Sequence, residues 1–345
     1  MKKIWALLLC AALLTGCGAL SADPAEDGRL RIVTTLFPYY DFARAIAGDR
    51  AEVTLLLVPG REAHSFEPTP LDAVTLSRAD ILVCNGGESE AWLDDLLDAA
   101  GENIGTVLRM MDYVDARPEE LVEGMQGAEE HDHGGKSEAE HDHDETREQE
   151  AHAAGGGEAA HSHGADSDEI EYDEHIWTAP ENAAALCETI GEALCAADPD
   201  NAAYYRANCE GYVRSLRALD ARFRALRERS ARDLLVFADR MPMLYLCKAY
   251  GLQYRAAFHG CSTDTEPSLG TLLFLIELVR AERVPVVYTV DLDSRKIAEA
   301  VSECTGAAIE TLYSMQTVSR ADFYAGETYL TLMERNLEAL ERGLC

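Results

Sequence analysis

The chain has 345 residues, more than one ordinary hydrophobic core needs, so two domains of about 150 residues each are expected. Hydrophobic residues make up 47 % of the sequence, which excludes a wholly disordered chain. The formal net charge of -32, from 30 basic and 62 acidic side chains, excludes a nucleic-acid-binding role, because binding a phosphate backbone needs a surface rich in Lys and Arg. It also disfavours adsorption to anionic lipid. A surface this acidic favours a cation as the ligand.

The N-terminus has the pattern of an export signal. Lys2 and Lys3 precede an apolar run at 4–14, which is too short to span a bilayer. The run ends in Leu-Thr-Gly-Cys at 14–17, which resembles the lipobox of bacterial lipoproteins. We therefore expect a signal peptide at 1–16, acylation of Cys17, and a lipidated tether at 17–28 that holds an extracytoplasmic protein on the outer face of the cell membrane.

Short β-branched runs alternate with helical patterns after the tether, which predicts βαβ units and a parallel sheet. The expected strands are at 30–35, 53–58, 81–85 and 106–109, and the expected helices are at 39–47, 70–78 and 90–99. Together with a helix at 180–196, they form a predicted N-terminal lobe at 29–198.

The same alternation returns in the C-terminal part of the chain, which predicts a second α/β lobe at 232–345. Its expected strands are at 234–238, 254–258, 286–290 and 308–312, and its expected helices are at 243–250, 268–283, 295–304 and 327–344. Between the lobes, apolar residues spaced by three and four predict a linking helix at 199–231, helical from 201 to 229. The predicted fold is therefore α/β, with two mainly parallel sheets flanked by helices and joined by a long, rigid spine helix.

The segment 123–174 differs in kind from both lobes. It holds seven of the ten histidines, eighteen acidic side chains and only two basic ones. Because it has almost no apolar residues to bury, it is predicted to be a mobile loop. Its His-Asp-His and His-Ser-His clusters favour weak, multi-site capture of divalent transition metal ions by His131, His133, His141, His143, His161 and His163, with His152 nearby.

Four other side chains are candidate metal ligands with fixed geometry. His64, Asp239 and Asp291 each come after a predicted strand, and His175 comes just before a predicted helix. In open parallel sheets, ligands bind beyond the carboxyl ends of the strands. These residues, distant in sequence, could therefore converge in a cleft between the lobes.

The helix after His175 is preceded by a Ser/Thr-x-x-Glu pattern. In this pattern a hydroxyl side chain and a carboxylate three residues later cap the first turn. We therefore expect Thr178 and Glu181 to form the N-terminal cap of that helix.

Several motifs follow one another in order along the chain: Val-Thr-Thr-Leu-Phe-Pro at 33–38, Ala-His-Ser-Phe-Glu-Pro-Thr-Pro at 63–70, Ala-Asp at 79–80 leading to Asn-Gly at 85–86, Tyr-Asp-Glu-His-Ile-Trp at 172–177 and Pro-Glu-Asn at 180–182. Together they resemble the motifs of zinc and manganese ABC-transporter solute-binding proteins of the ZnuA and AdcA kind, and the similarity covers nearly the whole chain after the signal. A His-rich acidic loop before the second ligand is also typical of the zinc-binding members. The resemblance implies a monomeric receptor that works with an ABC permease and its ATPase.

The resemblance places the first metal ligand at His64 and the second at His175. The third, a histidine in that family, has no clean match, because Ala238 occupies the usual place. Asp239 is the preferred replacement, and His259 and Cys261 are alternatives.

The acidic fourth ligand of the family corresponds best to Asp291, with Asp293 second. Two histidines and two aspartates suit either zinc or manganese, since more carboxylate oxygen favours manganese. The His-rich loop favours Zn2+ as the transported ion, with Mn2+ as the alternative.

Two other functions are weighed against an importer receptor. A metallohydrolase would need an open metal position and a base such as Glu67 or Glu174, but no catalytic motif such as HExxH is present, so no enzymatic activity is expected. The second alternative is a surface zinc buffer, in which the His-rich loop at 123–174 alone would bind the metal ions.

Overall fold

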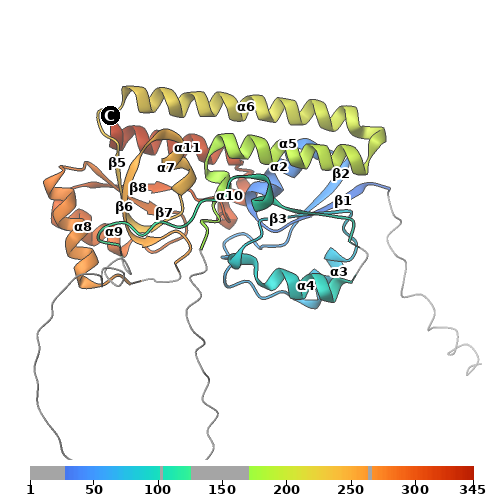
Figure 1. Ribbon diagram of the computed structural model, residues 1–345, viewed down its shortest axis with the longest axis horizontal. Helices are drawn as coiled ribbons and strands as arrows, with labels where there is room; N and C mark the ends of the chain where they lie inside the picture. The colour runs from blue at the N-terminus through green and yellow to red at the C-terminus, as the bar shows by residue number, and fades with distance from the viewer. Residues whose placement is uncertain (1–27, 102–103, 126–170, 263–265) are drawn as a thin grey trace, which may run out of the picture.

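The computed structural model describes residues 28–101, 104–125, 171–262 and 266–345. It contains two four-stranded parallel sheets, one in each lobe (Figure 1). In the first sheet the strand order is β2-β1-β3-β4, with β1 at Leu30–Thr34, β2 at Ala51–Leu55, β3 at Ile81–Cys84 and β4 at Thr106–Arg109. The helices of this lobe are α2 (Phe37–Ala47), α3 (Pro70–Leu76) and α4 (Trp92–Ala100).

The second sheet repeats the arrangement with the order β6-β5-β7-β8. Its strands are β5 (Leu234–Met241), β6 (Gln253–His259), β7 (Val286–Val290) and β8 (Ala308–Leu312). Its helices are α7 (Leu244–Tyr250), α8 (Leu269–Ala281), α9 (Lys296–Thr305), α10 (Arg320–Ala325) and α11 (Tyr329–Leu344). In both lobes the first strand lies inside the sheet. The chain therefore crosses over that strand when it passes from β2 to β3 and from β6 to β7.

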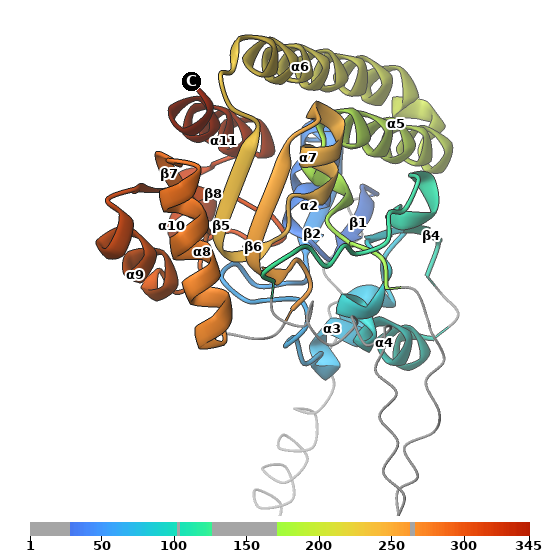
Figure 2. The same cartoon turned by 60° about the vertical axis from the view of Figure 1, so that its left-hand side comes forward.

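Two long helices form the back of the molecule, α5 (Pro180–Ala197) and α6 (Ala202–Arg229) (Figures 1 and 2). The apolar residues of α6 recur at spacings of three and four and are buried, which is the pattern that the sequence predicts: Tyr205, Cys209, Val213, Leu216, Leu219, Phe223 and Leu226. One hydrophobic cluster includes side chains from α2, α5, α6 and α11 and from the second sheet. The spine helix therefore packs into a core shared by both lobes.

The predicted fold class is confirmed, and each predicted strand and helix lies within a few residues of an observed one. One helix was missed in the sequence, α10, which has six residues and begins after Ser319, whose hydroxyl accepts the N–H of Asp322. Within the described ranges, four short 3-10 helices also were not predicted, at Glu88–Glu90, Met110–Tyr113, Ile176–Thr178 and Pro199–Asn201.

The predicted cap of α5 is wrong. The residue at the cap is Ala179, and no side chain closes the first turn. The Thr178 hydroxyl instead donates to the carbonyl of His175 at 2.8 Å, inside the 3-10 turn Ile176–Thr178. A second support comes from Asn182, whose amide donates to the Ile176 carbonyl at 3.0 Å. The hydroxyl and the amide therefore fix the turn that carries His175.

The segment treated as a mobile loop in the sequence has a folded end. Asp173 and Glu174 are buried, and Tyr172 pairs with Pro118 in an isolated antiparallel bridge. The six loop histidines proposed for metal capture, and Cys17 with the signal peptide, lie outside the described residues. Among the described residues, no helix combines the length and the apolar character needed to cross a membrane.

Candidate metal centre

A cavity of about 330 Å3 lies where loops of the two lobes meet. Its lining comes from three parts of the chain: loops of the first sheet, the segment that connects β4 to α5, and the end of β6. The residues that line it are His64, Gly87, Glu88, Met111, Glu119, Glu171, Tyr172, Glu174, His259 and Cys261. Three of these, His64, His259 and Cys261, have nitrogen or sulfur donors that suit zinc.

His64 lies in the loop between β2 and α3 and is partly buried. Burial lowers the pKa of its imidazole, and the charge on His175 lowers it further, while Glu174 raises it. The His64 ring therefore interacts electrostatically with His175, which lies 111 positions later in the sequence. A lowered pKa keeps the His64 ring neutral, which is the form that binds a metal ion.

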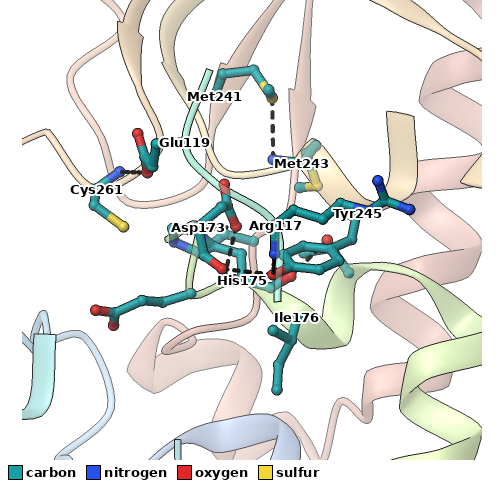
Figure 3. A network of polar contacts seen from close by, with 12 residues as sticks. Arg117, Glu119, Asp173, His175, Ile176, Met241, Met243, Tyr245 and Cys261 are labelled. Atoms are coloured by element: carbon teal, nitrogen blue, oxygen red, sulfur yellow. Dashed lines mark hydrogen bonds and ion pairs between the residues drawn. The ribbon is translucent and has the colours of Figure 1, made fainter. Parts of the chain in front are cut away.

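His175 is fixed by Asp173 (Figure 3). The Asp173 Oδ1 atom accepts the backbone N–H of His175 at 2.8 Å and lies 3.4 Å from His175 Nδ1. Burial alone would lower the pKa of the His175 ring, but Asp173, Glu119 and Glu174 raise it above its ordinary value. A carboxylate beside one ring nitrogen of a histidine sets the orientation of the other, as is usual around metal ligands.

The Asp173 segment is held by Tyr245 on α7 (Figure 3). The Tyr245 hydroxyl donates to the Asp173 carbonyl at 2.8 Å and accepts the Arg117 N–H at 3.0 Å. Because Tyr245 belongs to the second lobe, this contact ties the segment that carries His175 to that lobe. The imidazole is therefore supported from both sides of the cleft.

Glu174 closes the cavity on the side of the first lobe. Its carboxylate accepts the backbone N–H of Ser89 at 3.1 Å and also the Ser89 hydroxyl. Gly87 lies directly beneath, with a φ of 90°. A Cβ at Gly87 would lie 2.5 Å from Glu174 Oε1, so both the backbone conformation and the close approach require glycine here.

Glu119 contacts the residues of the second lobe that line the cavity. Its Oε2 atom is 2.6 Å from His259 Nδ1, and its Oε1 atom accepts the Cys261 N–H at 3.0 Å. Burial opposes ionisation, but the His259 contact keeps the pKa of Glu119 below its ordinary value. Figure 3 shows Cys261 beside Glu119, across from the Asp173 and His175 pair. Glu119 therefore orients the His259-Gly-Cys261 turn at the end of β6.

The two aspartates proposed as ligands are bound to their own lobe. Asp239 Oδ2 accepts the Val290 N–H at 3.0 Å and the Thr289 hydroxyl at 2.7 Å, so its carboxylate joins β5 to β7. Asp291 Oδ1 accepts the Ser314 N–H at 2.7 Å. Burial raises the pKa of Asp291 to about 7. Neither aspartate lines the cavity that contains His64.

Among the described residues, no three His, Cys, Asp or Glu side chains are already close enough to hold an ion. The structure thus brings His64, His259 and Cys261 around one cavity, and His175 does not line it. Sequence reasoning missed Glu119 and Arg240. The only signal for Glu119 was its position four residues before the acidic loop begins, and the signal for Arg240 was a lone cation beside Asp239.

Two parallel-sheet lobes, a helical back and a cavity lined by the imidazoles of His64 and His259 define a two-lobed solute-binding protein. The family model described as "Zinc-uptake complex component A periplasmic" (ZnuA) matches residues 32–343, and the chain belongs to this family. The curated relatives agree. The zinc-binding lipoprotein AdcA of Streptococcus pneumoniae is 31% identical over 99% of this chain and 61% of its own length. The high-affinity zinc uptake system protein ZnuA of Bacillus subtilis is 29% identical over 100% of this chain and 99% of its own.

Solved structures match the fold at similar levels. The metal-dependent lipoprotein YcdH of Bacillus subtilis has a TM-score of 0.69 and 26% identity, covering 92% of this chain and 100% of that chain. The Zn(II)-bound ZnuA-like domain of Streptococcus pneumoniae AdcA has a TM-score of 0.68 and 26% identity, covering 92% and 99%. This chain spans 61% of the length of the AdcA protein that it matches.

Proposed function

We propose that the chain is the extracytoplasmic solute-binding component of a metal ABC importer, that it captures Zn2+ between its lobes and that it delivers the ion to a permease driven by an ATPase. The observation that carries this proposal is the cavity where loops of the two lobes meet, which His64, His259 and Cys261 line. Membership of a zinc-uptake family and the names of its relatives, zinc-binding AdcA and zinc-uptake ZnuA, support the same ion. This family consists of receptors for uptake, so no enzymatic role is assigned.

The ligand set that the geometry favours is His64 and His175, completed by His259 and Cys261. His259 and Cys261 line the cavity together with His64, whereas the carboxylates of Asp239 and Asp291 are already engaged by backbone N–H groups. Nitrogen and sulfur donors favour zinc over manganese, which prefers oxygen. Because the donors are not yet within joint reach of one ion, binding requires a small movement of the loops that carry them.

The protein acts at the cell surface in this proposal. Acylation at Cys17 would tether it beside the permease through the residues that follow, and one polypeptide chain would carry one tight site. The six loop histidines, His131, His133, His141, His143, His161 and His163, would bind further ions weakly and raise the local concentration of zinc near the cleft.

Isothermal titration of the full-length chain in detergent tests the cleft site. The His64→Ala/His175→Ala variant should lose more than about a hundredfold in zinc affinity, because even the loss of a residue that only supports a ligand costs about 10 to 100-fold. The control is Glu88→Gln, an exposed side chain that lines the same cavity and has no assigned role. Unchanged tight binding in the double variant would overturn the proposed site.

Deleting residues 126–170 separates a receptor from a zinc buffer that depends on the loop. A receptor keeps one tightly bound ion and loses only weak sites, because His64 and His175 remain. A buffer loses nearly all binding. Repeating the titration with Mn2+ in the deletion variant measures the preference of the cleft itself.

A further inference from the structure

Arg240 lies near the carboxyl end of β5 and contacts loops of both lobes. The pairing of β5 with β6 is irregular between Phe237 and Arg240, and irregularities of this kind change the direction in which a side chain points. Only 20% of the Arg240 side chain is exposed. A guanidinium group stays charged at all relevant pH values, so the cleft contains a permanent cation.

The Arg240 guanidinium binds three segments of the chain. Its Nη2 atom donates to Glu62 Oε1 at 2.8 Å, in the loop of the first lobe that carries His64. Its Nε atom donates to Asp293 Oδ2 at 3.2 Å, and Nη2 also donates to the other oxygen of that carboxylate, in the loop after β7 of the second lobe. Its Nη1 atom donates to the carbonyl of Ser262 at 3.4 Å, next to Cys261.

These contacts connect the segments that carry the proposed donors. Glu62 is two residues before His64, and Ser262 follows Cys261 directly. The planar fork of an arginine fixes its partners in direction as well as in distance. Arg240 therefore sets the separation between the His64 loop of one lobe and the Cys261 turn of the other.

The same contacts occupy two carboxylates beside the proposed site. Glu62 and Asp293 both lie in loops at the cleft, and the carboxylate of each accepts a hydrogen bond from the Arg240 guanidinium. Carboxylate oxygens would move the preference of a metal site toward manganese. With Glu62 and Asp293 bound to Arg240, two fewer carboxylates can reach the ion.

We propose that Arg240 is a positioning residue for the cargo site: it holds the His64 loop against the second lobe and withholds Glu62 and Asp293 from the metal ion, which favours zinc over manganese and slows zinc release. This inference rests on the proposed function of the cleft. Arg240 does not touch the ion and is not a ligand.

The test compares Arg240→Met, which removes the charge and keeps the length, with Arg240→Lys, which keeps the charge and loses the fork. The full-length chain in detergent is loaded with zinc, and the slow phase of its release to a chelator is timed. Zn2+ and Mn2+ affinities are measured by titration. In Arg240→Met, zinc release should be about tenfold faster or more and the ratio of zinc to manganese affinity about tenfold lower, the scale of losses around a metal ligand. Arg240→Lys should fall between Arg240→Met and the unmodified chain.

The matched control is Arg335→Met. Arg335 also pairs with two carboxylates, Asp322 and Glu327, but inside the second lobe and away from the cavity. Its release rate and its ion preference should stay within about threefold of the unmodified chain, the scatter expected for a surface ion pair.

Glu62→Gln gives an independent route if Arg240→Met does not fold. Glu62 is 46% exposed, so the substitution leaves packing intact and removes the charge from the contact between Glu62 and Arg240. Zinc release should again be faster, with a smaller change in ion preference, because Asp293 stays bound to Arg240. Release rates and ion ratios equal to those of the unmodified chain, in whichever of these variants folds, would overturn the inference. Absence of tight zinc binding in the unmodified chain would instead overturn the proposed function.

Discussion

The back of the molecule and its cleft are built from opposite kinds of contact. At the back, Phe42 packs its ring against Tyr212 and Tyr329, with centroid distances of 5.8 and 5.0 Å. Asp41 beside it accepts the Tyr212 hydroxyl at 2.7 Å and the Tyr329 N–H at 3.0 Å. These residues come from α2, α6 and α11, so a dry, shared core joins the lobes.

In the cleft, the lobes meet through polar and charged groups instead. Arg240 binds Glu62, and Tyr245 binds the Asp173 segment. Polar contacts beside a cavity can exchange with water at low cost, whereas separating a packed aromatic core exposes apolar surface. The difference predicts that the lobes stay in a nearly fixed relation and that cargo enters and leaves through movements of the cleft loops.

The strongest test of this contrast is Phe42→Ala at the back. Phe42 is fully buried, so truncation should lower the free energy of unfolding by about 3–5 kcal/mol, the usual cost of removing a buried aromatic side chain. Chemical denaturation of the full-length chain measures the loss. The rate of zinc release, timed well below the melting temperature, should change less than about threefold, since no cleft contact is touched.

The control for this truncation is Tyr324→Ala on α10, which removes an aromatic side chain that is 84% exposed. Its effect on the free energy of unfolding should stay within about 0.5 kcal/mol. If Phe42→Ala were as mild as Tyr324→Ala, the shared core would not be what holds the lobes together.

The next test concerns a buried acid under the cleft, Glu90. Its Oε2 atom accepts the N–H groups of Asn85 and Gly86 at 2.8 and 2.9 Å, and burial raises its pKa from 4.5 to about 7. The folded state therefore holds the proton more tightly than the unfolded state. The resulting stabilisation is complete below about pH 4.5 and is lost as the pH rises through about 7.

Glu90→Gln cannot take up this proton, so its free energy of unfolding should fall less than that of the unmodified chain between pH 5 and pH 8, by about 1–3 kcal/mol. Urea denaturation at both pH values measures the difference. Glu88→Gln, on the exposed side of the same turn, should leave the pH dependence unchanged. Parallel pH curves for Glu90→Gln and the unmodified chain would show that Glu90 is not the group responsible.

The sequence predicts the strands and helices of this molecule better than the donors of its metal site, and the reason is physical. Strands and helices follow from apolar periodicity, which is a local property, so the stripe from Tyr205 to Leu226 could be read directly. The position of His64 at a cavity beyond the strands could also be expected, because ligands bind beyond the carboxyl ends of the strands in parallel sheets. The exact donors could not be read in this way.

The aspartates after β5 and β7 illustrate this. Their position in the sequence suits a ligand, and in the folded chain their carboxylates accept backbone N–H groups of Val290 and Ser314. Whether an acid at a strand end faces the cleft or caps its own loop depends on a bulge and on the path of another loop. Neither is encoded in the local pattern, so only the folded chain distinguishes Asp239 from Arg240, its immediate neighbour.

The smallest expected effect on zinc affinity comes from changing a residue that orients a proposed ligand, not the ligand itself. Asp173 orients the His175 imidazole, with its Oδ1 atom 3.4 Å from Nδ1. Asp173→Asn keeps the shape and removes the charge, so zinc affinity measured by titration should fall about 10 to 100-fold, or about 1.4–2.8 kcal/mol. Glu171→Gln, an exposed carboxylate two residues earlier, should change it less than about threefold. Asp173→Asn could instead keep full affinity while His64→Ala/His175→Ala loses it. Tyr245 and the turn at Ile176–Thr178 would then orient the imidazole without help from the Asp173 carboxylate, and the rigidity of the cleft would come from its backbone.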